Sequence, residues 1–361
     1  MKLACFHLLN DYSGSPKILK LILSELLDKG IPVDLITSSG GVLDELLCYT
    51  NLHKSSYRYM FSTNPVITTL HYLRVQIYAF FLSFRYLLNR DVVFYINTVL
   101  PVGPALAGKI MGKRVIYHYH ENAKAKGTVY KMLCWCMQVL ATDIICVSHY
   151  QRSFLKRKKN IYTIPNALPS ELIKQFTLNS EQAFERKTIL MLSSLKLYKG
   201  ALEFTRLSQM LPKYNFIWVI NDEQTYIDSF IKEYHITIHD NLSIFPRQNN
   251  VTPFYNRCSL VLNLSNKEKF IETFGLTALE AMANGIPVIV PTEGGIAEMV
   301  QDGINGYKID VQELDKIADR ICHILSDKSL FCRLSTNALQ YSKQFNAANM
   351  TEQIFHLITK N

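Results

Sequence analysis

Two glutamates eight residues apart could do chemistry: Glu272 and Glu280 flank a glycine in the stretch ETFGLTALE. A glycine at the expected start of a helix leaves the N–H groups of residues 273–276 without helical partners, and such groups bind phosphate or hydroxyl oxygens. Glu280 follows about two turns along the helix. One carboxylate can then bind a sugar and the other a ribose. On spacing alone, two glutamates on a solvated helix face remain an alternative.

A lysine-containing turn is the second candidate element: LKLYKG, residues 195–200, where a predicted strand runs into a helix. A cation here can neutralise the charge that develops on a departing diphosphate. Lys199 is the principal candidate and Lys196 is a second one. An exposed lysine with no ligand is the alternative for both.

The turn between the first predicted strand and helix, DYSGSP at residues 11–16, is the third element. Gly14 permits a close backbone approach to a ligand, and Pro16 suits the first turn of a helix. The turn lacks the pattern G-x-G-x-x-G, so a dinucleotide cofactor is poorly supported. An ordinary strand-to-helix connection is the alternative.

A histidine pair ends another predicted strand in the stretch YHYHEN, residues 117–122. Side chains alternate along a strand, so His118 and His120 share one face. A metal pair, a buried structural histidine and a substrate contact all remain open for these residues.

The window from Glu272 to residue 295 resembles the E-x7-E signature of glycosyltransferase family 4, including the trailing EAMANGIPVI and GG. The stretch DGINGY, residues 302–307, is similar to the D-G-x-N-G turn of that family. The resemblance implies that Glu272 binds hydroxyls of the donor sugar and Glu280 the ribose. It also implies that the amides of four residues help to hold the sugar and diphosphate: Thr273, Phe274, Gly275 and Leu276.

The same resemblance extends to the other elements. Lys199 matches the diphosphate-binding lysine of the family, but Ser193 and Ser194 stand where the family has Gly-Arg. The second cation of the family is therefore missing, and Lys196 is the candidate that could replace it. Gly14 corresponds to the glycine-rich loop that contacts diphosphate or acceptor, and His120 to a donor-sugar contact near the reacting carbon.

Apolar runs of strand length alternate with amphipathic helical segments along the chain, which predicts α/β domains with parallel sheets. We expect two Rossmann-like doubly wound domains that face each other across a cleft, the GT-B arrangement implied by the resemblance. Residues 1–166 would form the acceptor-binding domain and residues 167–345 the nucleotide-sugar donor domain. The helix in residues 346–361 would cross back to the first domain.

The resemblance implies a retaining glycosyltransferase acting on a glycan acceptor, and we expect one that works in bacterial-type cell-surface polysaccharide synthesis such as lipopolysaccharide or capsule. A UDP-sugar is the favoured donor. A nucleotide-sugar epimerase of similar fold and a catalytically silent sugar-nucleotide-binding protein are the alternatives. The sequence contains no D-x-D triplet, the usual clamp for a metal-bridged diphosphate. We therefore expect a metal-independent enzyme with no cofactor.

Charge and composition indicate the environment. The net charge is +9, and the whole positive excess lies in the first 165 residues. The eight dispersed cysteines suit a reducing, cytoplasmic location, and the sequence shows neither a signal peptide nor a spanning segment. The aromatic and basic stretch 57–90 suits peripheral contact with an anionic membrane, and hence a lipid-linked glycan acceptor. An ordinary core helix with a solvated basic surface is the alternative. No nucleic-acid-binding signature is present.

Overall fold

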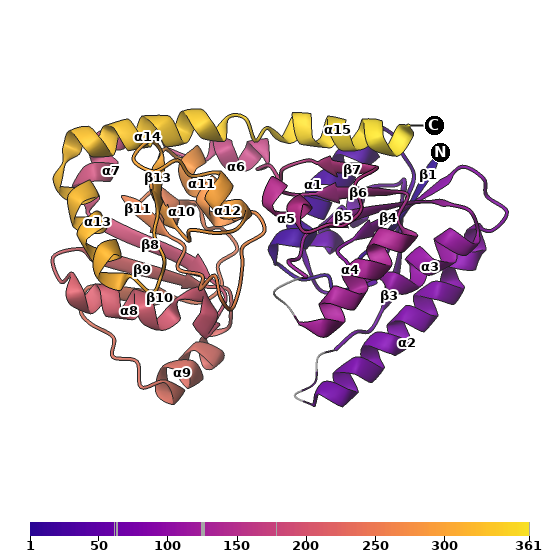
Figure 1. The fold of residues 1–361 in the computed structure, drawn as a ribbon, viewed down its shortest axis with the longest axis horizontal. Helices are drawn as coiled ribbons and strands as arrows, with labels where there is room; N and C mark the ends of the chain where they lie inside the picture. Colours follow the sequence, from indigo (N-terminus) through magenta and orange to yellow (C-terminus); the bar gives the residue numbers. More distant parts are fainter. Residues whose placement is uncertain (61, 63, 124–126, 178, 361) are drawn as a thin grey trace. The chain divides into compact units, whose positions relative to one another are not determined.

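The computed structural model describes residues 1–60, 62, 64–123, 127–177 and 179–360. The chain forms two compact units, one from residues 1–167 together with 347–361 and the other from residues 168–346 (Figure 1). The sequence had placed the boundary after residue 166. Each unit is built on one parallel sheet covered by helices, which confirms the predicted fold class of two Rossmann-like α/β domains.

The first unit contains a seven-stranded sheet. Its strands are β1 (Lys2–Phe6), β2 (Val33–Ser38), β3 (Leu52–Tyr57), β4 (Val92–Asn97), β5 (Arg114–Tyr119), β6 (Asp143–Cys146) and β7 (Ile161–Thr163). All pairings are parallel, in the order β3-β2-β1-β4-β5-β6-β7. The order reverses between β1 and β4, so a crevice for ligands is expected at the carboxyl ends of these two strands.

Helices cover both faces of this sheet. They are α1 (Gly14–Asp28), η1 (Val42–Cys48), α2 (Pro65–Ser83), η2 (Phe84–Tyr86), α3 (Val102–Ile110), α4 (Thr128–Leu140), α5 (His149–Ser153) and α15 (Ala347–Thr359). Crossovers between parallel strands are right-handed, so α2, α3 and α4, which carry the chain from β3 to β6, share one face. The crossover α1 runs in the opposite direction along the sheet and covers the other face.

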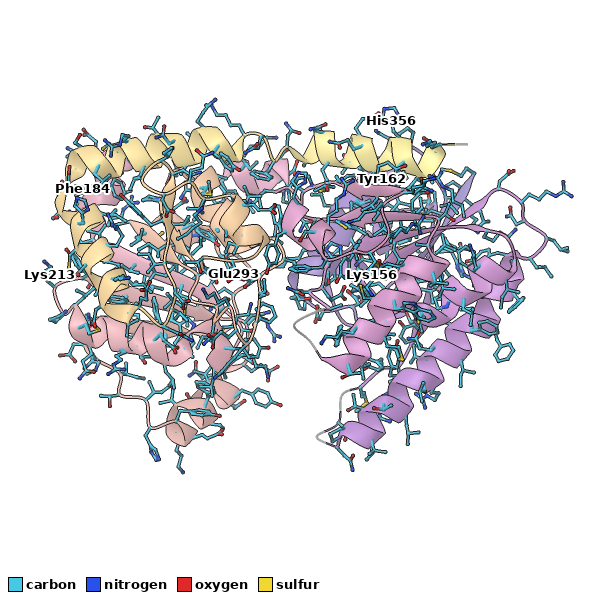
Figure 2. The ribbon with its side chains drawn as sticks, in the orientation of Figure 1. Lys156, Tyr162, Phe184, Lys213, Glu293 and His356 are labelled. Atoms are coloured by element: carbon cyan, nitrogen blue, oxygen red, sulfur yellow. The ribbon has the colours of Figure 1, made fainter. Side chains whose placement is uncertain are left out.

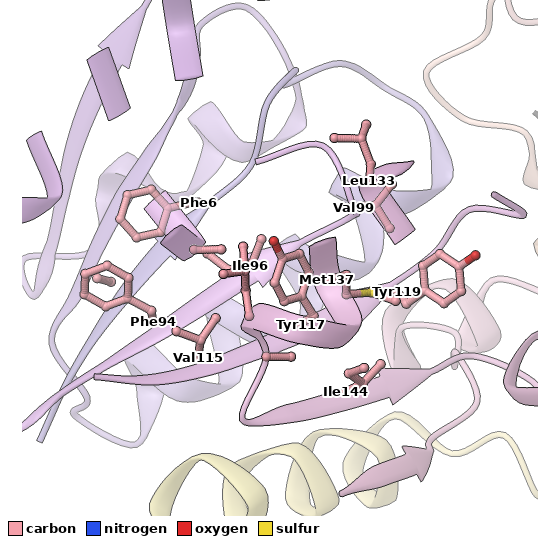
Figure 3. Packing of buried hydrophobic residues seen from close by; sticks show 14 of the residues in the cluster. Phe6, Phe94, Ile96, Val99, Val115, Tyr117, Tyr119, Leu133, Met137 and Ile144 are labelled. Atoms are coloured by element: carbon pink, nitrogen blue, oxygen red, sulfur yellow. The ribbon is translucent and has the colours of Figure 1, made fainter. Parts of the chain in front are cut away.

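One hydrophobic core cluster of the first unit lies between the sheet and the face carrying α3 and α4 (Figure 3). Phe94 and Val115 come from neighbouring central strands, and both are buried in this cluster. Leu133 and Met137, one turn apart on α4, belong to this core, where Met137 lies beside Tyr117 and Leu133 beside Val99 (Figure 3). The apolar strands and the inner face of α4 thereby fix the positions at which β4 and β5 end.

The C-terminal helix α15 packs on α1 of the first unit. Lys29 forms an ion pair with Glu352 at 2.5 Å, and its ammonium group lies over the ring of Phe355. On the exposed side of the helix, His356 lies 3.0 Å from Glu352 (Figure 2). The last helix therefore belongs to the domain that contains the N-terminus, although residues 168–346 separate the two in sequence.

The second unit contains a six-stranded sheet. Its strands are β8 (Thr188–Ser193), β9 (Asn215–Ile220), β10 (Leu242–Phe245), β11 (Leu260–Leu262), β12 (Val288–Val290) and β13 (Gly306–Lys308). They are parallel in the order β10-β9-β8-β11-β12-β13. The order reverses between β8 and β11, which makes their carboxyl ends the expected ligand-binding edge of this unit.

The helices of the second unit follow the same alternation. They are α6 (Ser170–Lys174), α7 (Ser180–Arg186), η3 (Leu197–Lys199), α8 (Ala201–Met210), α9 (Gln224–Glu233), α10 (Thr252–Tyr255), α11 (Leu276–Ala283), α12 (Gly295–Glu298), α13 (Leu314–Ser326) and α14 (Lys328–Ser342). The loop before α11 and the turn η3 hold the residues of the predicted site.

Candidate functional site

The structure brings Lys199 and Glu272 together at the carboxyl edge of the second sheet. Lys199 ends η3, which follows β8, and Glu272 lies in the loop that follows β11. The two strands are hydrogen-bonded neighbours where the strand order reverses. Two residues separated by 73 positions in sequence thus meet at the place where open α/β sheets bind their ligands.

Among the described residues, the hydrogen bonds to the Glu272 carboxylate all go to one of its two oxygens. Oε1 accepts hydrogen bonds from Lys199 Nζ at 2.5 Å, from Ser265 Oγ at 3.2 Å and from Asn263 Nδ2 at 3.4 Å. Among the described residues Oε2 has no hydrogen-bond partner. The side chains of Glu272 and Lys199 remain 18% and 14% exposed, so a ligand can reach them. The carboxylate is therefore anchored through one oxygen and presents the other.

The electrostatics of the pair favour the charged state of the acid. Burial is the largest influence on the pKa of Glu272 and acts to raise it. The charge and hydrogen bond of Lys199, with the hydrogen bonds of Asn263 and Ser265, outweigh burial, so the pKa of Glu272 lies below its ordinary value. At neutral pH the site thus holds a carboxylate beside an ammonium group.

Two aromatic rings support the lysine. Tyr198 and Phe270 stack with ring centroids 5.2 Å apart and an interplanar angle of 12°. The Nζ atom of Lys199 lies 3.6 Å from the centre of the Phe270 ring, a favourable cation–π geometry. Asn266 N donates to Tyr198 O at 2.8 Å and joins the two loops. Burial and then the charge of Glu272 raise the pKa of Tyr198. The lysine is therefore held by packing as well as by its ion pair.

The glycine of the motif begins α11 as predicted. Gly275 has φ +92°, and a Cβ atom there would lie 2.5 Å from the side chain of Ile296, so only glycine fits. The N–H groups of residues 274–277 donate to no acceptor among the described residues. Phe274 is itself buried, with its ring against Phe345, so it can contribute only its backbone amide to a ligand. Thr273 and Leu276 are half-buried beside it.

The second glutamate has its own support. Glu280 lies on α11 and is half-buried, and its Oε2 accepts a hydrogen bond of 2.5 Å from the hydroxyl of Tyr255. The same hydroxyl lies 3.2 Å from the carbonyl of Thr277. Tyr255 is fully buried, and burial, followed by the charge of Glu280, raises its pKa. The tyrosine is therefore a neutral donor that fixes one oxygen of Glu280.

The structure leaves Lys196 outside this group. Its side chain is exposed and forms no ion pair within the part of the chain that the structure describes. Ser193, where the resembling family has glycine, accepts a hydrogen bond of 2.9 Å from the indole nitrogen of Trp218. Ser193 thus provides a hydrogen-bond acceptor for the side-chain N–H of a fully buried tryptophan. Its presence has a structural reason and brings no cation into the site.

In the first unit, His120 joins a buried network at the edge where its sheet reverses order. Nε2 of His120 lies 3.0 Å from Asn97 Oδ1, and Asn97 Nδ2 lies 3.1 Å from His7 Nδ1. The rings of His118 and His120 are 4.1 Å apart, so they share a face as predicted from alternation. The hydroxyl of Tyr95 contacts His118 Nδ1 at 2.8 Å.

The histidines of this network are neutral at physiological pH. Burial is the main cause that lowers the pKa of His7 to about 4 and that of His118 to about 3. Burial, followed by the neighbouring histidines, holds the pKa of His120 well below its ordinary value. Across residues 1–60, 62, 64–123, 127–177 and 179–360, no group of three or more His, Cys, Asp or Glu is placed to share a metal ion. The geometry suits neutral hydrogen-bonding imidazoles, and His118 is a buried structural residue.

Gly14 is the first residue of α1 and is exposed. The turn before it is closed by Asp11, whose Oδ1 accepts from Ser13 N at 2.9 Å. Gly14 has no side chain and lies exposed at the start of the helix, outside the left-handed region of the backbone. Its contact with the diphosphate or acceptor, implied by the family resemblance, stays a prediction.

Several supporting residues were not predicted. In the second unit these are Asn263, Ser265 and Tyr255, and in the first unit His7 and Asn97. A usable signal exists for the first two, because polar side chains two positions apart directly after an apolar strand lie on one face. Likewise His7 and Asn97 are the first polar residues after, or at the end of, the apolar strands β1 and β4.

Comparison with known proteins agrees with this geometry. Residues 174–341, which lie within the second unit, match the family model of glycosyl transferases group 1. The chain is 34% identical over 124 residues to the N-acetyl-alpha-D-glucosaminyl L-malate synthase of Bacillus anthracis. That match covers 34% of this chain and 31% of the relative, so it spans less than a third of the relative's length.

Solved structures resemble the whole chain. The structure of Anabaena HepE in complex with UDP and glucose has a TM-score of 0.80 at 19% identity and covers 100% of both chains. WaaG, a glycosyltransferase involved in lipopolysaccharide biosynthesis, has a TM-score of 0.72 at 16% identity and covers 99% of this chain and 100% of its own. At these identities the likeness shows a common fold, that of GT-B glycosyltransferases.

Proposed function

We propose that the protein is a retaining glycosyltransferase that takes a sugar from a UDP-sugar and transfers it to a glycan acceptor. The observation that carries this proposal is the Glu272 carboxylate, anchored through Oε1 beside Lys199 at the reversal point of the second sheet. The residues that build it lie in the segment that matches glycosyl transferases group 1. The structures of HepE with UDP and with UDP-glucose support a UDP-sugar as donor.

Each group of the site has a role in this reaction. Glu272 Oε2 accepts hydrogen bonds from donor-sugar hydroxyls, and Lys199 neutralises the diphosphate. The N–H groups of residues 274–277 donate to phosphate or sugar oxygens at the start of α11. Glu280, held by Tyr255, binds the ribose hydroxyls. The family resemblance adds His120 as a donor-sugar contact, which as a neutral imidazole can exchange hydrogen bonds without a charge of its own.

The proposed reaction is a transfer in which the acceptor attacks on the face from which the diphosphate leaves. The bond between the anomeric carbon and the diphosphate oxygen breaks, and its electron pair leaves with the diphosphate. The acceptor hydroxyl attacks from the same face, and its proton passes to the departing diphosphate oxygen. Attack and departure on one face retain the anomeric configuration. In this mechanism Glu272 positions the sugar and forms no bond to it, since the acceptor hydroxyl attacks the anomeric carbon directly.

We further propose that transfer needs no metal ion. The sequence offers no D-x-D clamp, and Lys199 supplies a positive charge next to the sugar-binding carboxylate. The chelator EDTA is therefore expected to leave the initial rate of transfer unchanged. Loss of activity with EDTA and its return with Mg²⁺ would refute metal independence without affecting the assignment of the donor site.

The acceptor is proposed from a broader likeness. The fold is similar to that of WaaG, a glycosyltransferase involved in lipopolysaccharide biosynthesis. We propose a bacterial-type cell-surface polysaccharide, such as lipopolysaccharide or capsule, as the molecule that receives the sugar.

A product assay tests this function. The full chain is incubated with UDP-glucose or UDP-N-acetylglucosamine and a panel of glycan acceptors, and UDP release and the product are measured. We expect acceptor-dependent UDP release and a product whose anomeric configuration, read by NMR, matches that of the donor. The variant Glu272→Gln should lose this activity, whereas Lys196→Met, a change of a neighbouring exposed lysine, should keep it. Conversion of the donor alone would indicate an epimerase, and binding without turnover a silent sugar-nucleotide-binding protein.

A further inference from the structure

Helix α2 carries a row of exposed apolar side chains on its outer side. Val66, Leu70, Leu73, Ile77 and Phe81 follow one another at intervals of three or four residues, so they form a stripe along one face of the helix. Their exposed fractions lie between 48% and 67%. An apolar stripe of this length normally faces a core.

The buried residues of the same helix are Val75, Gln76, Ala79 and Ser83. Gln76 is buried, and its Oε1 accepts from Gly103 N at 2.9 Å. A Cβ atom at Gly103 would lie 2.2 Å from the carbonyl oxygen of Gln76, so α2 and α3 pack with their backbones close together. Ala79 and Ser83 complete the buried side, with Ser83 Oγ donating to Ala79 O at 2.6 Å. Helix α2 thus packs on the unit through these residues, with Tyr72 and Leu82 partly buried against the core, and leaves the stripe outside.

The two neighbouring helices extend the apolar surface. Helix α2 packs against α3 and α3 against α4, and the three lie side by side over one face of the first sheet (Figure 1). Large apolar side chains that are 43% to 63% exposed continue from the stripe onto α3 and α4: Leu106, Ile110, Val129, Met132, Trp135 and Val139. We call the outer side of α2, α3 and α4, with the stripe and these residues, the apolar helical face.

This face is basic and lacks acids. The sequences of α2, α3 and α4 contain no Asp or Glu, and residues 46–170 hold only three acids. Two of them are turned inward: Glu121 is buried and accepts from Val99 N, and Asp143 is buried in an ion pair with Arg114. Exposed basic side chains occur on these helices or in the segments next to them in sequence: Arg58, Arg74, Arg85, Lys109 and Lys131.

These charges decide between possible partners. A second copy of the same face would bring like charges together, which opposes self-association. An anionic lipid surface offers hydrocarbon for the apolar side chains and negative headgroups for the arginines and lysines. Within the described parts of the chain, no helix combines the length and the apolar character needed to cross a bilayer. The fitting arrangement is a helix that lies along the surface.

We propose that the apolar helical face docks in the interface of an anionic membrane, with α2 parallel to the surface and Trp135 at the headgroup level. The proposal does not depend on the enzymatic activity. It rests on the exposed stripe, on its continuation onto α3 and α4, and on the absence of Asp and Glu from the three helices. It also widens the earlier expectation, which came from residues 57–90 alone, to a surface made by three helices.

Vesicle binding tests the proposal. The full chain is mixed with vesicles of phosphatidylcholine alone or of phosphatidylcholine with phosphatidylglycerol, and the bound fraction is measured by flotation. We expect binding only to the anionic vesicles and weaker binding at high salt. The chain has two tryptophans, and Trp218 is fully buried in the second unit whereas Trp135 is 63% exposed. A blue shift of fluorescence on vesicle addition therefore reports Trp135 entering the interface.

Matched variants distinguish membrane binding through the apolar helical face from nonspecific hydrophobic binding. The triple change Leu70→Gln, Ile77→Gln and Phe81→Gln alters only exposed side chains and should reduce binding at least about tenfold. The control Tyr226→Gln with Ile238→Gln removes exposed apolar residues from the second unit and should bind like the wild type. Equal binding of the triple variant, or no binding of the wild type to anionic vesicles, would overturn the proposal. So would a dimer in light scattering that the triple change dissociates.

Discussion

Gly294 holds the backbone of Glu272 in place. Gly294 has φ +112°, and a Cβ atom on it would lie 2.5 Å from the carbonyl oxygen of Glu272. That carbonyl accepts a hydrogen bond of 2.8 Å from the next residue, Gly295. The loop after β12 therefore positions the acid that lies in the loop after β11, and the glycine is required by both its conformation and its contact.

The variant Gly294→Ala tests this relationship. The added methyl group must displace Glu272, so we expect donor affinity, measured by calorimetry with UDP-glucose, to fall at least about tenfold. The control is Gly303→Ala in the same unit, where φ is +72° but the nearest atom, in Tyr307, is 3.8 Å away. The control should lose about 1 kcal/mol of unfolding free energy and keep its affinity. Equal affinities of the two variants would contradict the positioning role.

Tyr255 is predicted to act on the donor through Glu280. Tyr255→Phe removes the 2.5 Å hydrogen bond and should lower donor affinity about three- to tenfold, with a loss of about 1–2 kcal/mol in unfolding free energy. Tyr214, a buried tyrosine that precedes β9 at the amino edge of the sheet, gives a control. Tyr214→Phe should change the donor affinity by less than about twofold. If Tyr255→Phe binds the donor as well as wild type does, Glu280 needs no such support.

The buried histidines predict how stability depends on pH. Their folded pKa values, about 4 for His7 and about 3 for His118, lie below the ordinary histidine value. Between these values and pH 6.5 the unfolded chain binds protons that the folded chain does not, so the unfolding free energy falls as pH falls. Above pH 6.5 this contribution is constant.

Urea unfolding between pH 4.5 and 7.5, roughly the range over which an unperturbed histidine titrates, measures the effect. Each histidine that stays neutral in the folded state contributes a slope of about 1.4 kcal/mol per pH unit below its unfolded pKa. His118→Gln keeps an acceptor for Tyr95 and should remove one such contribution. An unchanged slope in this variant would mean that His118 is charged or solvated in the folded state.

Most of the fold could be predicted because its strands are buried on both faces and read as apolar runs. The helix expected within residues 346–361 is observed as α15, Ala347–Thr359. Two strands at a sheet edge do not show such an apolar run. β3 has the mixed sequence LHKSSY and pairs only with β2, while β13 has three residues and pairs only with β12. The polar residues of β3 and the shortness of β13 leave little of the apolar signature that central parallel strands carry.

The residues of the site that belong to a sequence motif could be predicted. Glu272, Lys199 and Gly275 were identified from motif and spacing, and the first two form an ion pair. Their supports depend on side chains brought together from separate loops, as in the contacts of Glu272 with Asn263 and Ser265. Such pairings are set by the tertiary fold, because sequence spacing alone does not say which polar residues beyond a strand meet.

Calorimetric binding of UDP-glucose to matched variants tests the donor site most directly. Glu272→Gln removes the charge but keeps the shape, and Lys199→Met removes the cation but keeps the stem that packs on Phe270. Each should weaken binding about 10- to 100-fold, as expected for loss of a charge-assisted hydrogen bond, whereas Lys196→Met should bind like the wild type. Wild-type affinity in both Glu272→Gln and Lys199→Met would contradict the central claim that this pair holds the donor.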